Sequence, residues 1–97
     1  MDMRALMKQA QKMQEKMQHE VAELRVEASS GGGMVTVTMA GNREIAAVKI
    51  APEVVESKDV EMLEDLVRAA VNEANRKVEE ALQEKMSAFK IPGLPGF

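Results

Sequence analysis

The chain of 97 residues has no cysteine, no tryptophan and no tyrosine, and only two phenylalanines. The absence of cysteine excludes a disulfide framework, a thiolate metal site and a cysteine nucleophile, and it agrees with a reducing cytoplasm. The scarcity of aromatic side chains disfavours stacking on the bases of single-stranded nucleic acid. A hydrophobic core must therefore be built from aliphatic residues and from some of the nine methionines.

Long apolar segments are also missing. No stretch approaches the roughly 20 apolar residues of a membrane span, and the first residues run directly into charged sequence rather than the apolar core of a signal peptide. We therefore expect a cytoplasmic protein with no membrane association. The length allows one domain, which we place at residues 1–90. Residues 91–97, rich in proline and glycine, are expected to form a flexible tail.

Groups that carry catalysis are few and isolated. His19 is the only histidine, so it has no second histidine for a metal, and we expect it to be solvated or at an interface. Neighbouring carboxylates such as Glu64 and Asp65 diverge on a helix. The glycines at 31–33 lack the Gly-Lys-Ser/Thr ending of a phosphate-binding loop, so we interpret them as a hairpin loop. We predict no enzyme, metal site, cofactor or small-molecule substrate.

Two periodicities divide the rest of the chain. Apolar side chains recur every three or four residues from 3 to about 24, which predicts a long helix. Alternating patterns and turn residues then predict an antiparallel meander of three strands. The predicted strands cover residues 24–28, 35–39 and 44–50. Pro52 is expected to open a short helical turn, Pro52 to Glu56, before Ser57 or Asp59 caps a second long helix.

The apolar stripe of that second helix comprises Val60, Leu63, Val67, Ala70, Val71, Ala74, Val78, Ala81 and Leu82, with Met86 and Phe89 beyond. The predicted fold is therefore α+β: a long helix, a three-stranded antiparallel meander, a short helical turn and a long helix. A helix of 22–25 residues is about 35 Å long, whereas short strands span only about 17–20 Å. Both helices must overhang the sheet, and an overhanging apolar stripe needs another surface to bury it. We therefore predict a homodimer, with sheet edges, helix stripes or both at the interface.

Charge is distributed unevenly along the chain. The net charge of −3 argues mildly against nucleic acid, but residues 1–19 carry +2, residues 20–75 carry −6 and residues 76–97 carry +1. In the first helix Arg4, Lys8, Lys12 and Lys16 recur at every fourth position and form what we call the basic ridge. Glutamines beside it can hydrogen-bond to phosphate or base edges. The ridge is either a phosphate contact or an ordinary solvated face.

Methionines concentrate in the same helix, at Met1, Met3, Met7, Met13 and Met17. Methionine fills irregular gaps and adapts to varied partners. These side chains either pack in a core or dimer seam, or line a groove that binds peptides.

The whole chain resembles the YbaB/EbfC family of bacterial nucleoid-associated proteins. The matching features follow one another in order: the Met/Gln/Lys-rich segment Met7–Gln14, the segment Ser30–Val37 with its glycines, Val48–Pro52, Leu63–Val67, Ala69–Ala74 and the Gly/Pro-rich tail. No single feature is specific to the family. The combination of these features in this order, over residues 3–97, is specific.

The resemblance implies a tweezers-like homodimer whose sheets build the body and whose helices project as arms. It implies binding of duplex DNA with low sequence specificity, in order to organise the nucleoid or modulate transcription, without catalysis or cofactor. The family's binding is associated with its long helices. On this chain, the resemblance therefore assigns DNA binding first to the basic ridge and then to Arg76, Lys77 and Lys85. The alternative is a protein-binding adaptor or chaperone-like clamp that uses the Met-rich helix and Leu94 and Phe97 of the tail.

Overall fold

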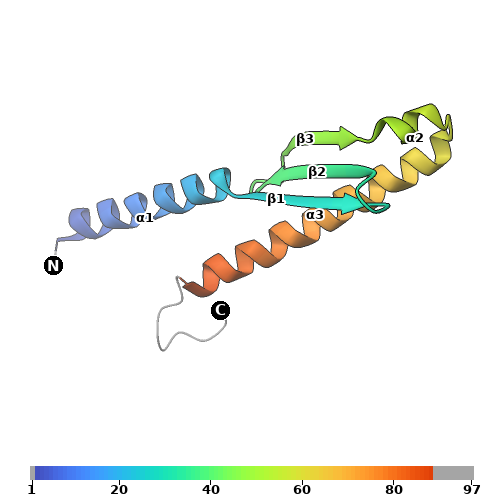
Figure 1. Cartoon of the computed structure of the whole chain (residues 1–97). Helices are drawn as coiled ribbons and strands as arrows, with labels where there is room; N and C mark the ends of the chain where they lie inside the picture. Colours follow the sequence, from blue (N-terminus) through green and yellow to red (C-terminus); the bar gives the residue numbers. More distant parts are fainter. Residues whose placement is uncertain (1, 89–97) are drawn as a thin grey trace.

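The computed structural model describes residues 2–88 and has the predicted order of elements (Figure 1). The elements are α1 (Met3–Glu23), β1 (Arg25–Ser30), β2 (Val35–Ala40), β3 (Ile45–Ile50), α2 (Pro52–Glu56) and α3 (Val60–Ala88). The α+β fold class is therefore confirmed. The tail predicted at 91–97 lies outside the described residues.

The three strands form one antiparallel sheet in the order β1-β2-β3. The loop between β1 and β2 contains Gly31, Gly32 and Gly33, whose φ angles are 59°, 68° and 96°. Such left-handed backbone favours glycine because a Cβ is disfavoured there. The glycine triplet is thus a hairpin loop, as predicted, and not a phosphate cradle between a strand and a helix.

The core lies between α3 and one face of β1 and β2. Ala28, Val35, Val37 and Met39 are buried on the sheet, and they meet the buried side chains of α3, which are Ala70, Ala74 and Val78. Two small residues on α3 allow the helix axis to approach the sheet closely. The core is consequently narrow, and the part of it formed by residues 2–88 contains no aromatic side chain.

The stripe predicted for α3 was wrong at Val60 and at Met86, which is 51% exposed, and it was incomplete at a third position; Phe89 lies outside the described residues. Val60 is 63% exposed, because it lies in the first turn of α3, ahead of Leu63, where the helix joins the core. Leu66 was left out of the prediction but packs against the core. Its main-chain carbonyl accepts a hydrogen bond of 2.6 Å from the Ser30 hydroxyl, which fastens the β1–β2 loop to α3.

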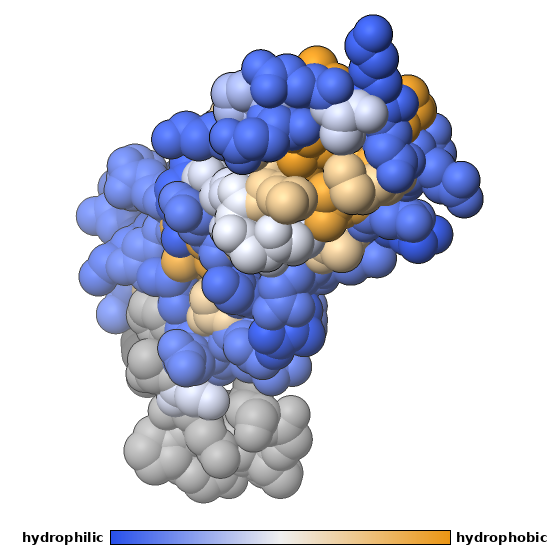
Figure 2. All heavy atoms as spheres, turned by 45° about the vertical axis from the view of Figure 1, so that its right-hand side comes forward, coloured by the Kyte–Doolittle hydropathy of each residue, from blue (hydrophilic) through white to orange (hydrophobic). Residues whose placement is uncertain are grey.

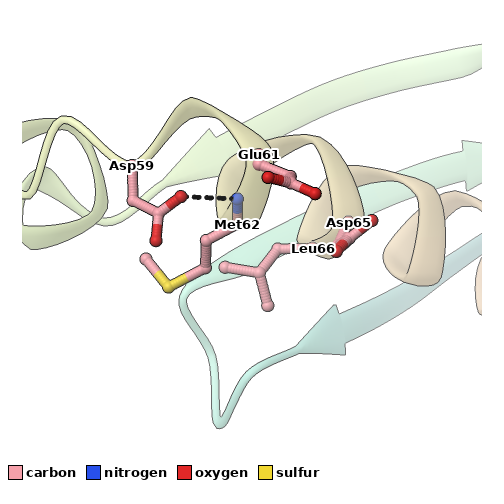
Figure 3. Close-up of a pocket in the computed structure, with 5 residues that line it drawn as sticks. All are labelled: Asp59, Glu61, Met62, Asp65 and Leu66. Carbon is pink, nitrogen blue, oxygen red and sulfur yellow. Dashed lines mark hydrogen bonds between the residues drawn. The ribbon is translucent and has the colours of Figure 1, made fainter.

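Aspartates cap both long helices. The Asp2 carboxylate accepts a hydrogen bond from the Arg4 N–H at 3.0 Å, and the Asp59 carboxylate accepts one from the Met62 N–H, also at 3.0 Å (Figure 3). Each bond satisfies a backbone donor that the first helical turn leaves free. Of the two caps considered for the second long helix, Asp59 is the one used.

The molecule is elongated, with extents of 67 × 24 × 15 Å and a radius of gyration of 18.9 Å. A compact chain of about 100 residues has a radius of gyration near 13 Å. The difference arises because α1 and the C-terminal part of α3 project from the same end of the sheet as two arms (Figure 1). No residue of α1 is buried. In residues 2–88, no helix combines the length and apolar character that a membrane crossing requires.

Candidate nucleic-acid interface

The basic ridge lies on the exposed surface of α1. Arg4, Lys8, Lys12 and Lys16 are all exposed, and their row is about 18 Å long at 1.5 Å per residue. That length corresponds to about five base-pair steps of 3.4 Å. Among residues 2–88, none of these four side chains takes part in an ion pair. Their charges are therefore available to an external anion.

An apolar stripe occupies the other side of α1. We define the α1 stripe as Met3, Leu6, Ala10, Met13 and Met17. With 100° between successive residues, the mean direction of the basic ridge lies about 160° from that of the α1 stripe. Met3 and Met13 are largely exposed in the single chain. A partner that covers the α1 stripe therefore leaves the basic ridge in solvent.

Arg76 on α3 is already engaged by carboxylates. Its guanidinium is ion-paired with Glu73 and with Glu80 on the same helix. The hydrogen bonds with Arg76 lower the pKa of the Glu73 carboxyl, and those with Glu73 raise the pKa of the Arg76 guanidinium. A DNA phosphate at Arg76 would have to compete with two carboxylates that the protein already supplies.

Lys77 and Lys85 also differ from the basic ridge. The Lys77 ammonium donates a hydrogen bond of 2.7 Å to the Glu27 carbonyl of β1, and it joins α3 to the edge of the sheet. Lys85 is half-buried in the last turn of α3, where a cation stabilises the negative end of the helix dipole. The three predicted α3 residues thus have roles within the fold, whereas the basic ridge has none.

The junction where α2 ends and α3 begins lies at the end of the molecule away from the arms (Figure 1), and its sequence is rich in acidic residues. The exposed members are Glu53, Glu56, Asp59, Glu61, Glu64 and Asp65. Figure 3 shows three of them around the first turns of α3. Among the residues described, no group of three or more possible ligands could hold a metal ion. This end repels a polyanion, so electrostatics favour contact at the arms.

The helix-facing side of the sheet is only partly covered. Ile45, Val48 and Ile50 of β3 pair with Met39, Val37 and Val35, so they share the face on which α3 lies. Because α3 packs on β1 and β2, these three side chains remain 48%, 47% and 39% exposed. We call them the β3 face. Figure 2 shows the main apolar area towards the upper right of that view, with smaller apolar areas at the left and below, on a surface that is otherwise mostly hydrophilic.

Sequence reasoning missed the part played by Arg43. It counted this residue only as one charge of the acidic middle. The structure places it in the β2–β3 turn with a φ of 71°, and its guanidinium donates to the Asn75 carbonyl and side-chain oxygens at 3.2 Å and pairs with Glu79. The turn residues Gly41 and Asn42 were enough to predict a turn here. Nothing in the local sequence indicated that Arg43 attaches this turn to α3.

The sequence is similar to that of a known family of DNA-binding proteins. A sequence model of the YbaB/EbfC DNA-binding family matches residues 1–94. A nucleoid-associated protein of Alkaliphilus metalliredigens is 49% identical over 96% of this chain and 88% of its own length. A nucleoid-associated protein of Chloroflexus aurantiacus is 47% identical over 99% of this chain and 98% of its own length.

Among solved structures, an uncharacterised protein from Helicobacter pylori superposes with a TM-score of 0.75 at 24% identity, over 92% of this chain and 97% of that one. This likeness supports the fold. The family match and the sequence relatives together establish that the chain belongs to the YbaB/EbfC DNA-binding family.

Proposed function

We propose that this protein binds duplex DNA through the basic ridge of α1, without catalysing a reaction, as a protein of the bacterial nucleoid. The observation that carries the proposal is the ridge itself, whose cations are exposed and have no carboxylate partner among residues 2–88, on the side of α1 opposite its apolar stripe. Membership of a DNA-binding family supports it, as do relatives named nucleoid-associated proteins.

Low sequence specificity follows from the side chains available. Lysine and arginine reach phosphate oxygens, and such contacts fix position without reading bases. Glutamines beside the ridge add hydrogen bonds of the same kind. Arg76, Lys77 and Lys85 are secondary contacts in this proposal, because Arg76 must first leave Glu73 and Glu80, and Lys77 must leave Glu27.

A homodimer completes the proposed arrangement. The β3 face and the α1 stripe are apolar surfaces without a partner in the single chain. A second copy that covers either of them gives a tweezers-like body with paired arms. A dimer that offers four to seven bases on each copy, the basic ridge first and then Arg76, Lys77 and Lys85, could contact about 6–10 phosphates. Paired arms also offer a way to organise DNA or modulate transcription, since they can hold two stretches of duplex.

The alternative function is a protein-binding adaptor or chaperone-like clamp. It is favoured by the shallow apolar surface at Met13 and Met17, which continues towards Val21. Its second element, the tail with Leu94 and Phe97, lies outside the described residues. Peptide binding that is insensitive to salt and to the ridge charges would support this alternative over DNA binding.

The test is a titration of a random-sequence duplex at about 50 and about 200 mM salt. With 6–10 phosphate contacts, affinity should fall about 10³–10⁵-fold between these concentrations. A Lys8→Glu/Lys12→Glu/Lys16→Glu variant should lose binding at both. A Lys58→Glu variant is a single-site control, because it makes one such charge reversal at the acidic end of the molecule, and it should bind like the wild type. No binding at low salt, or equal binding by the folded triple variant, would refute the proposal.

A further inference from the structure

Gly41 stands at a close approach between the sheet and α1. It is buried, and its N–H donates a hydrogen bond of 3.1 Å to the Leu24 carbonyl just after α1 ends. A Cβ built on Gly41 would overlap the Val21 carbonyl oxygen and lie 3.0 Å from the carbonyl carbon and 3.1 Å from the Leu24 Cβ. The Val21 atoms belong to the backbone of the last turn of α1, so no side-chain rotation can relieve the overlap.

The same turn also holds α3. Arg43 lies two residues beyond Gly41, in the left-handed conformation, which is uncommon for a residue with a side chain. This conformation accompanies the contacts of its guanidinium with Asn75 and Glu79 in the middle of α3. The turn formed by residues 41–43 therefore meets both helices whose outer parts are the arms: Gly41 approaches the end of α1, and Arg43 contacts α3. We call this turn, with its contacts to Val21, Leu24, Asn75 and Glu79, the arm joint.

Few other contacts fix the direction of α1. The helix contains no buried residue, and its main packing is against β2. Where α1 ends, the Arg25 guanidinium also donates hydrogen bonds to the Ala22 carbonyl at 2.7 Å and to the Leu24 carbonyl at 3.0 Å. Leu24 is the single residue between α1 and β1, and it has already left the helical conformation, with a ψ of 135°. A helix without a buried face takes its orientation from its point of attachment, which here is the arm joint.

We propose that the arm joint is a positioning element for DNA binding. It sets the angle between α1 and α3, and hence where the basic ridge meets the duplex. The inference rests on the DNA-binding function proposed above. Gly41 and Arg43 act through the ridge and need not touch DNA themselves.

The length of α1 amplifies small changes at the joint. Relief of the overlap in Gly41→Ala requires the Val21 carbonyl to move by about 1 Å to reach ordinary contact. Val21 lies about 4.5 Å along the axis from Leu24, and the start of α1 lies about 31 Å away. A rigid rotation about Leu24 therefore displaces the far end by about 7 Å, twice the rise of a base pair. Each phosphate that a ridge cation no longer reaches should reduce affinity about tenfold near 50 mM salt.

The test measures arm geometry and binding separately. Because the chain has no cysteine, spin labels can be placed at Gln11→Cys on α1 and Glu84→Cys on α3, both of which are exposed. Doubly labelled protein is mixed with excess unlabelled protein, so that distances within one protomer are measured. Gly41→Ala should displace residue 11 by about 4 Å and so shift the mean distance by up to about 4 Å. Its DNA affinity, measured without labels, should fall at least tenfold at low salt.

Controls separate positioning from stability and charge. Gly32→Ala also strains a left-handed glycine, but no atom lies within 4 Å of its new Cβ, so both the distance and the affinity should stay unchanged. Arg43→Asn tolerates the left-handed backbone and removes the guanidinium contacts. It should shift or broaden the distance and weaken binding even if Gly41→Ala does not fold. Arg68→Asn removes the same charge away from the joint and should change neither.

The outcomes separate the two proposals. An unchanged distance in folded Gly41→Ala and Arg43→Asn proteins would overturn the positioning role. A shifted distance with wild-type affinity would also overturn it, and would leave DNA binding standing. If the wild-type protein fails to bind DNA at low salt, the proposed function fails first and the positioning role fails with it, whatever the distances show.

Discussion

Val48→Asp should convert the proposed dimer into a monomer. Val48 is at the centre of the β3 face, between Ile45 and Ile50, and about half of each of these side chains remains exposed. Complete burial of a valine or isoleucine side chain is worth about 1.5–3 kcal/mol, so burial of the remaining half is worth about 1 kcal/mol. A two-fold interface that covers both copies of the β3 face therefore gains roughly 6 kcal/mol from six side chains.

Because the dimer contains two copies of the chain, Val48→Asp removes the contributions of two valine side chains and places two carboxylates in an apolar interface. Each carboxylate without a partner costs several kcal/mol to desolvate. A loss of at least about 4 kcal/mol raises the dissociation constant of the dimer by about three orders of magnitude. Ala47→Asp is the matched control, since Ala47 is exposed on the same strand, pairs with Thr38 and faces the other side of the sheet.

Sedimentation velocity at micromolar concentration checks this prediction. The wild type and Ala47→Asp should sediment at twice the 10.7 kDa chain mass, and Val48→Asp at 10.7 kDa. Circular dichroism would confirm that the variant is folded. A wild-type monomer would refute the dimer itself. A folded Val48→Asp variant that remains dimeric would show that the interface lies elsewhere, with the α1 stripe as the next surface to test.

Three further predictions concern the fold. Ala74→Leu should reduce the free energy of unfolding by about 1–3 kcal/mol in urea melts, because buried Ala74 leaves no space between α3 and the sheet; an unchanged midpoint would contradict this close packing. Asp59→Ala should cost about 1 kcal/mol by the same assay, through loss of the cap on the Met62 N–H, while Asp59→Asn should retain most of it. Arg76 lowers the pKa of Glu73 below its ordinary value of 4.5. The interaction of the two side chains therefore stabilises the folded state slightly above that pH, and this stabilisation is lost as pH falls through the lowered pKa. Glu73→Gln should therefore flatten the acid limb of the stability–pH profile, and an identical limb would exclude this contribution.

Local patterns predicted the elements because each depends on neighbours in sequence. Alternation at Val35 and Val37 indicated a strand whatever it packed against, and Pro52 indicated the start of α2 because its φ suits a first helical position. The separation of the basic ridge from the α1 stripe is equally local, since it follows from helical geometry alone.

Contacts between distant residues were not predictable in this way. Lys77 appeared as a free cation in the sequence, yet it bonds to Glu27, 50 residues away. Arg76 had its carboxylates within one helical turn, so its engagement was readable from the spacing but was not considered. Leu66 was missed because its burial depends on the β1–β2 loop folding back over α3.

The sequence by itself therefore determined the order of helices and strands, the hairpin glycines, the basic ridge and the resemblance to a DNA-binding family. All of these depend on spacing along the chain. The tertiary structure alone decided that α3 leaves the β3 face open, that Lys77 of α3 is engaged by the Glu27 carbonyl of β1, and that Gly41 must lack a side chain. The physical reason is that coverage, hydrogen bonding between elements and close backbone approach are fixed by where a helix crosses a sheet, and no periodicity in one segment encodes that crossing.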